Sequence, residues 1–283
     1  MIFDDRRCEL GEGPLWHPLR KQLFWFDILG QSLLSQNREG AQIWRFPEMV
    51  SAAGWVSRDV LLIAGERDLF LFDLNSEEIE PLVELEAEIA TNRSNDGRAD
   101  RQGGFWIGTM SKRGEKSAGA IYRFYKGELR KLYPGITCPN AICFAPDGRM
   151  AQFADSATQR VYRVALDSDG WPIGAPELWA DLSATGIVPD GAVFDADGLM
   201  WQAQWGMGRV AVYDRAGTLL QTLPVCAPQA SCPAFGGDDL TTLFCTTAME
   251  HMSDKDRAAF ADAGKVFSQP GAGKGLAEPQ VKI

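Results

Sequence analysis

A short apolar motif recurs six times along this chain, and this recurrence constrains the fold more than any other feature. Each copy is one or two apolar runs closed by turn residues. The copies are KQLFWFDILGQSLL from Lys21, RDVLLIAGERDLFLFD from Arg58, GGFWIGTM from Gly103, GRMAQFADSATQRVYRV from Gly148, GLMWQAQWGMGRVAVYD from Gly198 and TTLFCTTA from Thr241. Units of one kind that repeat at this length stack on their neighbours and share a continuous core.

The spacing of the copies identifies the repeat unit. Equivalent positions, one in each copy, are Leu23, Val60, Phe105, Met150, Met200 and Thr242, which are 37, 45, 45, 50 and 42 residues apart. Four-stranded propeller blades repeat every ~40–50 residues. Hairpin turns that need positive φ are indicated at Glu39-Gly40, Gly103-Gly104, Asp147-Gly148 and Asp197-Gly198. The sequence therefore predicts an all-β, six-bladed β-propeller of four-stranded blades.

The chain ends and linkers give further expectations. With no Pro/Gly/Ser-rich linker or charge boundary, residues 1–283 are predicted to form a single propeller domain. The first residues, MIFDD, are expected to add the outer strand of the last blade and close the ring. The segment SDKDRAAFADAG is the one clear helix pattern, with Ser253 as N-cap and Gly264 as its C-terminal stop.

Composition excludes several kinds of partner. The net charge of −10 is spread along the chain, which argues against binding nucleic acid. No signal-peptide pattern and no apolar stretch long enough to span a bilayer are present, so we predict a cytoplasmic protein without a membrane partner. The six cysteines show no CxxC spacing, and we expect most of them to be buried small apolar residues. The oligomeric state is not indicated.

Several catalytic chemistries are also excluded. With only two histidines, His17 and His251, the chain cannot build a three-histidine zinc site. A serine nucleophile has no G-x-S-x-G elbow, and neither a P-loop nor a G-x-G-x-x-G fingerprint is present. The segments from Asp167 and Asp195, DSDG and DADG, lack the glutamate of an EF-hand and are interpreted as hairpin turns.

Polar residues occupy the same repeat position in four of the six copies. Stepping back 10 or 11 residues from the equivalent positions gives Glu12, Asn95, Asn140 and Asp190, with Val50 and Cys232 in the remaining two copies. Equivalent positions in a propeller lie at one height around the axis, so these side chains should converge at the mouth of the central channel. We therefore expect a mouth with one polar and one softer side.

Two carboxylates and two carboxamides form an oxygen-rich site. Such donors suit Ca²⁺, Mg²⁺ or Mn²⁺, and Zn²⁺ is compatible with them. The competing interpretation is that RSNDG and VPDGA are ordinary turns, in which Asn and Asp are common. The matched offsets favour a site for one divalent metal ion at the channel mouth.

At these residues the chain resembles the senescence-marker-protein/regucalcin/gluconolactonase family of sugar lactonases. The likeness runs in order through GEGPLW, RSNDGRADRQGGFWIGTM, PNAICFAPDGRMAQFADS, PDGAVFDADGLMWQAQWGMGRV and FGGDDLTTLFCTTA, nearly the whole chain. The resemblance implies a six-bladed propeller with one divalent metal. Two departures are Pro139-Asn140-Ala141-Ile142, where the family usually has Ser-Asn-Gly-Leu, and His17, where an aspartate often follows the first tryptophan.

The resemblance also implies roles for particular residues. Glu12, Asn140 and Asp190 correspond to the metal ligands, and Asp190 is also the expected general base. Arg93 and Asn95 correspond to residues that hold the hydroxyls and carbonyl of the substrate. The short segment SKRGEKSAG after Met110 indicates a reduced lid, with Glu115 as a weaker candidate for substrate contact.

The predicted reaction is hydrolysis of an aldonolactone, gluconolactone-like or a pentonolactone, to the aldonic acid. A divalent metal would polarise the carbonyl while Asp190 takes a proton from water, and Arg93 and Asn95 would position the sugar. Two alternatives stay open: a non-catalytic binding propeller with a structural metal, and a metal-dependent hydrolase of other esters or phosphotriesters. Trp55, Trp106, Trp201 and Trp205 are expected to fill the space between blades, with an aromatic wall against the sugar ring as the alternative. Cys232 is expected to be a packed thiol, and His17 to have a structural role.

Overall fold

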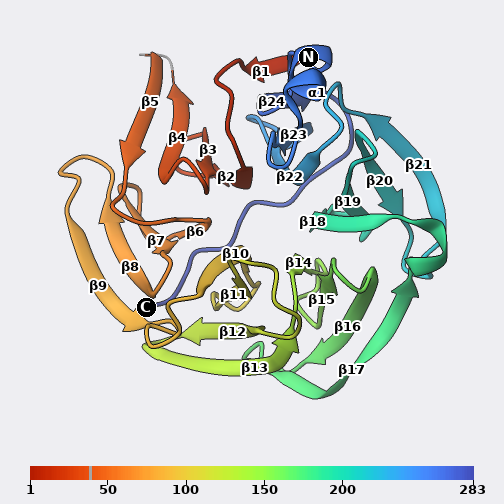
Figure 1. Cartoon of the computed structure of the whole chain (residues 1–283). Helices are drawn as coiled ribbons and strands as arrows, with labels where there is room; N and C mark the ends of the chain where they lie inside the picture. The colour runs from red at the N-terminus through yellow and green to blue at the C-terminus, as the bar shows by residue number, and fades with distance from the viewer. Residues whose placement is uncertain (38–39) are drawn as a thin grey trace.

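The computed structural model describes residues 1–37 and 40–283 of the chain. These residues form six four-stranded antiparallel sheets, arranged as blades around a central axis (Figure 1). The predicted six-bladed, all-β propeller is confirmed. In every blade the equivalent repeat position is the first or second residue of the second strand, as for Val60 in blade two and Thr242 in blade six. Within the described residues, no helix has the length and apolar character required to traverse a bilayer.

Each blade runs from an inner strand at the channel to an outer strand at the rim. The first three blades are β2 (Gly11–His17), β3 (Gln22–Asp27), β4 (Ser32–Asn37) and β5 (Gly40–Arg45); β6 (Ala52–Trp55), β7 (Val60–Ala64), β8 (Asp68–Asp73) and β9 (Ile79–Glu84); and β10 (Asn92–Ala99), β11 (Phe105–Ser111), β12 (Gly119–Tyr125) and β13 (Glu128–Ile136).

The remaining blades continue the same pattern. They are β14 (Pro139–Phe144), β15 (Met150–Asp155), β16 (Arg160–Leu166) and β17 (Pro172–Asp181); β18 (Val188–Phe194), β19 (Met200–Trp205), β20 (Arg209–Tyr213) and β21 (Leu219–Pro224); and β22 (Ala230–Gly236), β23 (Thr242–Thr247), β24 (Val266–Gln269) and β1 (Ile2–Asp4). A 3₁₀ helix, η1 (Ser183–Thr185), links β17 to β18.

The last blade joins the two ends of the chain. Strand β1 pairs with β24 in antiparallel fashion, with Ile2 opposite Phe267 and Asp4 opposite Val266. The prediction that MIFDD closes the ring is therefore confirmed. Because the last blade combines strands from both ends of the chain, this pairing fixes the first blade against the last.

Burial follows the position of each strand in its blade. Inner strands such as β14 and β22 are buried along their whole length, whereas the outer strands β9 and β21 are largely exposed. The core lies between neighbouring blades, where large side chains such as Trp25, Trp106 and Trp201 are fully buried. Trp106 and Trp201 thus have the predicted packing role.

The turn and helix predictions are largely confirmed. Gly103, Gly148 and Gly198 have φ values of 93°, 68° and 78°. Gly40 also has a positive φ of 130°, whereas Glu39 of the same predicted turn lies outside the described residues.

Helix α1 (Asp254–Ala259) begins where expected but ends early. The Ser253 hydroxyl caps it by accepting a hydrogen bond from the Asp256 amide. The prediction that Gly264 stops the helix is wrong, because the helix ends at Ala259 with Phe260 after it. Gly264 serves a close backbone approach instead. Its carbonyl accepts a hydrogen bond from the Cys8 amide at 2.8 Å, and a Cβ there would lie 2.5 Å from the Cys8 carbonyl oxygen.

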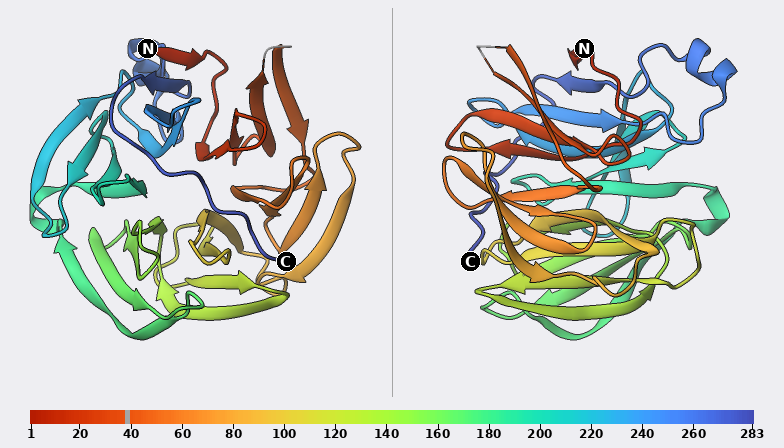
Figure 2. Two further views of the ribbon diagram at one scale, coloured as in Figure 1. Left: turned by 180° about the vertical axis from the view of Figure 1, so that it is seen from behind. Right: turned by 60° about the vertical axis from the view of Figure 1, so that its left-hand side comes forward.

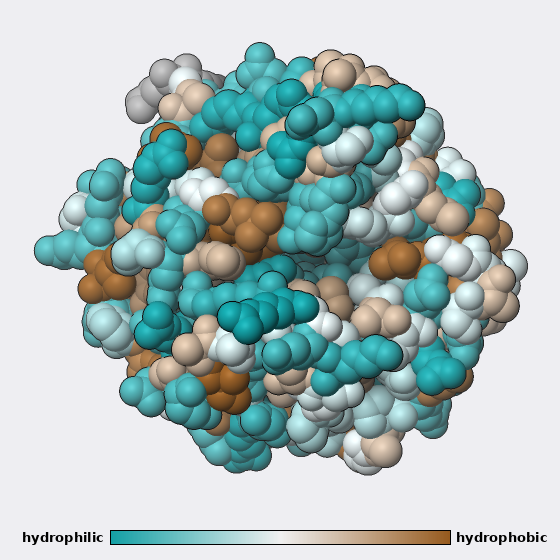
Figure 3. Space-filling view, viewed as in Figure 1, coloured by the Kyte–Doolittle hydropathy of each residue, from teal (hydrophilic) through white to brown (hydrophobic). Residues whose placement is uncertain are grey.

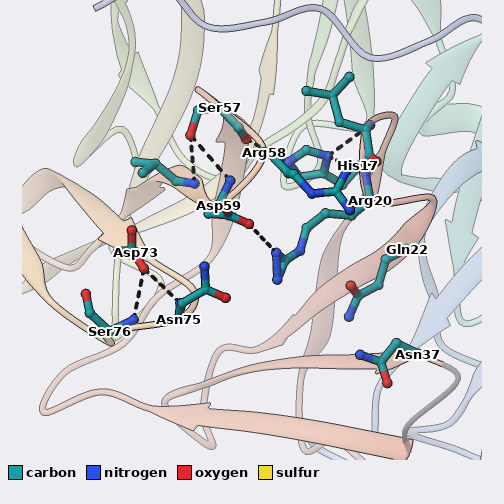
Figure 4. A network of polar contacts seen from close by, with 12 residues as sticks. His17, Arg20, Gln22, Asn37, Ser57, Arg58, Asp59, Asp73, Asn75 and Ser76 are labelled. Atoms are coloured by element: carbon teal, nitrogen blue, oxygen red, sulfur yellow. Dashed lines mark hydrogen bonds and ion pairs between the residues drawn. The ribbon is translucent and has the colours of Figure 1, made fainter.

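His17 ties the first two blades together (Figure 4). Its side chain is fully buried and its Nε2 donates to the Ser57 carbonyl at 2.9 Å, while Nδ1 accepts from the backbone amides of Leu19 and Arg20. Beside it, the Arg20 guanidinium pairs with Asp59 at 2.7 Å. With both ring nitrogens occupied by backbone groups, His17 has the predicted structural role.

The last residues of the chain close one end of the channel. Residues 270–283, here called the C-terminal strap, cross the ring on the face away from helix α1 (Figure 2). The strap bonds to residues that follow the inner strands: the Ala196 amide donates to the Lys274 carbonyl, and the Lys282 amide to the Gly103 carbonyl. The opposite end of the channel, where the inner strands begin, stays open and holds the predicted site.

Candidate functional site

Backbone bulges aim the polar residues at the open end of the channel. In β2, β10, β14, β18 and β22 the pairing with the next strand shifts register at the repeat position, whereas β6 pairs regularly. A bulge adds one residue to the strand and re-aims the side chains beside it. The residues after Glu12 and Asn140, Gly13 and Ala141, both adopt left-handed backbone with φ of 53° and 54°.

All five predicted site residues line one pocket of about 430 Å³: Glu12, Arg93, Asn95, Asn140 and Asp190. They come from β2, β10, β14 and β18, four inner strands that are distant in sequence. Figure 3 views this face and shows hydrophilic residues around a hollow near its centre, with hydrophobic residues on part of its rim. The matched repeat positions therefore do converge.

Apolar side chains form another part of the pocket wall. Its apolar side is formed by Leu10, Leu29, Met49, Met110, Val188 and Trp205. The expected softer side thus exists but is built from other residues. Val50 packs in the core and Cys232 is buried against Gly191, where a Cβ would lie 2.3 Å from the Cys232 sulfur. Core packing of Cys232 is confirmed, and Trp205 packs against the core while also lining the pocket.

Two buried carboxylates form the floor of the site. Glu12 and Asp190 are 6% and 4% exposed. Burial raises the pKa of Glu12 to about 8, and burial followed by the charge of Glu12 raises the pKa of Asp190 well above its usual range. Each accepts one hydrogen bond of 3.0 Å from the next residue, Gly13 N–H to Glu12 Oε2 and Gly191 N–H to Asp190 Oδ1.

A hydrogen-bonded chain orients the carboxamides and the arginine. Arg93 Nη1 donates to Asn95 Oδ1 at 2.7 Å, and Asn95 Nδ2 donates to Asn140 Oδ1 at 3.1 Å. Asn140 Nδ2 in turn donates to the Ser156 hydroxyl at 2.8 Å, and Ser156 Oγ donates to the Pro189 carbonyl at 2.5 Å. The chain spans three blades and leaves Asn140 with its oxygen, not its nitrogen, on the Asn95 side.

The donor set fits a hard divalent cation. Within the described residues, neither Glu12 nor Asp190 forms an ion pair, and the charge of Arg93 offsets only part of the cost of burying Glu12. No group of three or more His, Cys, Asp or Glu side chains in residues 1–37 and 40–283 is arranged to hold a metal. The candidate set therefore consists of two carboxylates and the oxygen of Asn140, the oxygen ligands preferred by Ca²⁺, Mg²⁺ and Mn²⁺.

Residues 10–249 match the sequence model of the SMP-30/gluconolactonase/LRE-like region. This chain belongs to that family. A putative sugar lactone lactonase of Rhizobium meliloti is 41% identical over 284 residues, covering 99% of this chain and 96% of the relative. The L-arabinolactonase of Azospirillum brasilense is 34% identical and covers 94% and 90%. The crystal structure of a calcium-binding protein, regucalcin, from Agrobacterium tumefaciens superposes with a TM-score of 0.97 at 37% identity, covering 100% and 97%.

Membership confirms the resemblance recognised in the sequence, and the lactonase names among these relatives support the expectation of an enzyme that hydrolyses cyclic esters. The candidate site of this family member also contains residues that sequence reasoning missed. Ser111, Lys112, Arg113 and Gly114 line the pocket from the segment expected to be a reduced lid, and Glu250 and His251 line it from the β23–α1 connection. These loops lie outside the repeat, so no matched offset could have identified them.

Glu115 does not line the pocket. It is exposed, and the Ser111 hydroxyl lies 3.4 Å from its Oε2.

Asp96, next to Asn95, is another residue near the site that the sequence analysis did not predict. It is buried, and burial raises its pKa to about 6. Its Oδ2 accepts a 2.7 Å hydrogen bond from the Ile142 amide, which links β10 to β14 directly beside Asn140. The motif RSNDG could have suggested Asp96, but its repeat offset differs from that of Asn95 by one.

Proposed function

We propose that this protein is a metal-dependent sugar lactonase, which hydrolyses an aldonolactone of the gluconolactone or pentonolactone type to the aldonic acid. The observation that carries the proposal is the convergence of Glu12, Arg93, Asn95, Asn140 and Asp190 on one pocket. The lactonase names of the relatives agree with it.

Glu12, Asn140 and Asp190 are the residues that would hold the ion. When bound, a divalent cation polarises the lactone carbonyl and lowers the pKa of nearby water. We propose Ca²⁺, Mg²⁺, Mn²⁺ or Zn²⁺ in this role, because the donor set consists of oxygen atoms only. The buried carboxylates also supply the negative charge that a dication would neutralise.

Asp190 is proposed to take the proton from the attacking water. Its Oδ1 is held by the Gly191 amide, whereas no donor in the described residues bonds to Oδ2. Burial favours the protonated form, so this carboxylate is a stronger base than an exposed aspartate. As the water oxygen bonds to the carbonyl carbon, the ring C–O bond breaks and the released hydroxyl receives a proton.

Arg93 and Asn95 are proposed to position the sugar. Arg93 is 6% exposed, and only its Nη1 bonds to the protein, through the Ser94 carbonyl and Asn95 Oδ1. Its remaining N–H groups have no acceptor in the described chain and can donate to a substrate oxygen. Such a fixed cation beside the reacting carbonyl stabilises the negative charge that develops on its oxygen.

A covalent enzyme intermediate is disfavoured by the side chains present. Cys138 lines the pocket, but burial, and next the charge of Asp190, raises the pKa of its thiol to about 12, which leaves little thiolate at neutral pH. The Ser156 hydroxyl donates to the Pro189 carbonyl rather than to a base. Water is therefore the proposed nucleophile.

The decisive experiment is acid release from a panel of five- and six-membered sugar lactones, followed with a pH dye. The protein would be stripped with EDTA, and each of the four metals would then be added back separately. We expect turnover that disappears on chelation and returns with at least one metal. No release above the spontaneous rate with any metal would favour a non-catalytic binding propeller. Faster turnover of phosphotriesters or linear esters would favour the other hydrolase alternative.

A further inference from the structure

The loop between β11 and β12 places two cations at the rim of the pocket. The Lys112 ammonium already has protein partners, because it forms an ion pair with Glu66 and donates to the Ala90 carbonyl at 3.0 Å. The Arg113 guanidinium has no such partners in the part of the chain that the structure describes. The backbone amide of Arg113 donates to the Ser111 hydroxyl, but its exposed side chain makes no hydrogen bond or ion pair within the described residues.

Arg93 stands deeper in the same pocket, and it also lacks a carboxylate partner among residues 1–37 and 40–283. A buried guanidinium without an ion pair is costly, unless a ligand supplies the missing acceptors. The pocket therefore presents unused guanidinium donors at two depths, Arg93 near the carboxylate floor and Arg113 at the rim.

The charge of the pocket differs from that of the whole protein. Three cationic residues (Arg93, Lys112 and Arg113) and three anionic residues (Glu12, Asp190 and Glu250) line it, so their formal charges cancel. A dication at the carboxylates would leave the loaded pocket net positive, within a chain of net charge −10. Such a local field attracts anions that the rest of the surface repels.

From these contacts we propose that the substrate is a sugar lactone with a second, anionic group on the carbon farthest from the ring carbonyl, and that Arg113 binds this group. The inference rests on the proposed lactonase function. With the carbonyl near Asp190 on the floor, the far end of the sugar points toward the rim, where Arg113 stands. Guanidinium groups bind carboxylate, phosphate or sulfonate oxygens in a bidentate manner, which a neutral hydroxyl cannot match.

The test compares neutral and anionic lactones within each ring size. Glucono-1,5-lactone with its 6-phosphate, and glucono-1,4-lactone with glucaro-1,4-lactone, would be assayed with the metal-loaded protein and with Arg113→Gln. We expect kcat/KM about tenfold or more higher for an anionic lactone. Arg113→Gln should remove most of this preference through KM, because it should lower kcat/KM for the anionic lactone about tenfold more than kcat/KM for the neutral one. Lys116→Gln is the matched control, because Lys116 is an exposed cation of the same loop that does not line the pocket.

Binding gives a readout that does not depend on turnover. By calorimetry, 6-phosphogluconate or glucarate should bind the wild-type protein more tightly than gluconate does, and Arg113→Gln should abolish the difference. Equal kcat/KM for the neutral and anionic lactones, together with equal binding of gluconate, glucarate and 6-phosphogluconate, would overturn the inference while leaving the lactonase proposal intact. No hydrolysis of any lactone would overturn the lactonase proposal, and the calorimetric comparison would still decide whether Arg113 binds anions.

Discussion

Asn95 donates a 3.1 Å hydrogen bond from its Nδ2 to Asn140 Oδ1, joining the third and fourth blades at the floor of the pocket. The same Nδ2 donates to the Pro139 carbonyl at 3.0 Å, and Asn95 Oδ1 accepts from Arg93. Asn95 thus connects a proposed substrate-binding arginine to a proposed metal ligand. Its geometry sets both the direction of the Arg93 guanidinium and the orientation of the Asn140 amide.

We expect Asn95→Ala to lower kcat/KM for a sugar lactone about 100-fold, because it frees Arg93 and Asn140 at once. Asn95→Asp would keep the acceptor for Arg93 but lose both donated bonds, and it would add a third negative charge beside Glu12 and Asp190. It should therefore be at least as impaired in turnover as the alanine variant. Steady-state kinetics would measure kcat/KM of both variants, and thermal unfolding would check that each variant is folded. Asn95→Asp with wild-type kcat/KM would show that the donated bonds are dispensable.

Substitutions of Glu12 and Asp190 should impair metal binding and turnover to different extents. Asp190→Ala removes the proposed base as well as a ligand, and we expect kcat to fall by about 10³-fold or more even at saturating metal. Glu12→Gln keeps the shape of the side chain but removes its charge, so the metal Kd should rise at least about tenfold, with activity partly restored by added metal. Metal titrations by calorimetry and kinetics separate the two effects.

The matched control for this pair is Asp197→Ala, an exposed aspartate of the same blade as Asp190. It should leave both metal binding and turnover unchanged. Wild-type kinetics in Asp190→Ala would mean that the base has been placed on the wrong residue.

The sequence predicts those parts of the fold and the site that recur in every repeat. Blade number, strand pairing and ring closure follow from period, apolar runs and turns, and the matched offsets located Glu12, Asn95, Asn140 and Asp190. The repeat pattern did not predict the pocket residues Arg113 and Glu250 or the course of the strap. These segments connect or follow the blades, and tertiary contacts rather than local sequence patterns determine their path. The helix end at Ala259 was missed for a similar reason, since Gly264 is needed against Cys8 and not as a cap.

Stability of the metal-free protein should fall as pH rises. Burial, and next the charge of Asp96, raises the pKa of Glu12 to about 8 from its ordinary value of 4.5, so the folded protein binds more protons than the unfolded chain between those values. The free energy of unfolding then decreases with pH across this window, by up to about 1.4 kcal/mol per pH unit for one such group. A bound dication opposes this loss, because it favours the ionised carboxylates.

We therefore expect the melting temperature of EDTA-treated protein to drop from pH 5 to pH 8, and the increase caused by added metal to grow over the same range. In Glu12→Gln the group cannot ionise, so the drop should be smaller. Differential scanning calorimetry at several pH values tests this. The same slope in wild type and Glu12→Gln would assign the pH dependence to other groups.

The far end of the channel depends on one buried ion pair. Glu278 of the C-terminal strap pairs with Arg98 at the end of β10, and both side chains are 9% exposed. Arg98 also donates to the Pro233 carbonyl, and the Glu278 carbonyl accepts from Trp55 Nε1 at 2.8 Å. Glu278→Ala leaves Arg98 charged, buried and without its partner. Removing one member of such a pair costs about 3–5 kcal/mol, far more than loss of a bond at the surface.

We expect this loss in the free energy of unfolding by urea, provided that the transition stays two-state. Gln280→Ala serves as the control, since its exposed side chain makes one hydrogen bond, to the Val56 carbonyl. It should cost about 1 kcal/mol or less. Equal effects of the two substitutions would mean that the strap is held by its backbone contacts alone. A measured loss for Glu278→Ala alone would identify the Arg98–Glu278 ion pair as the contact that fixes the strap to β10, the strand that also contains Arg93.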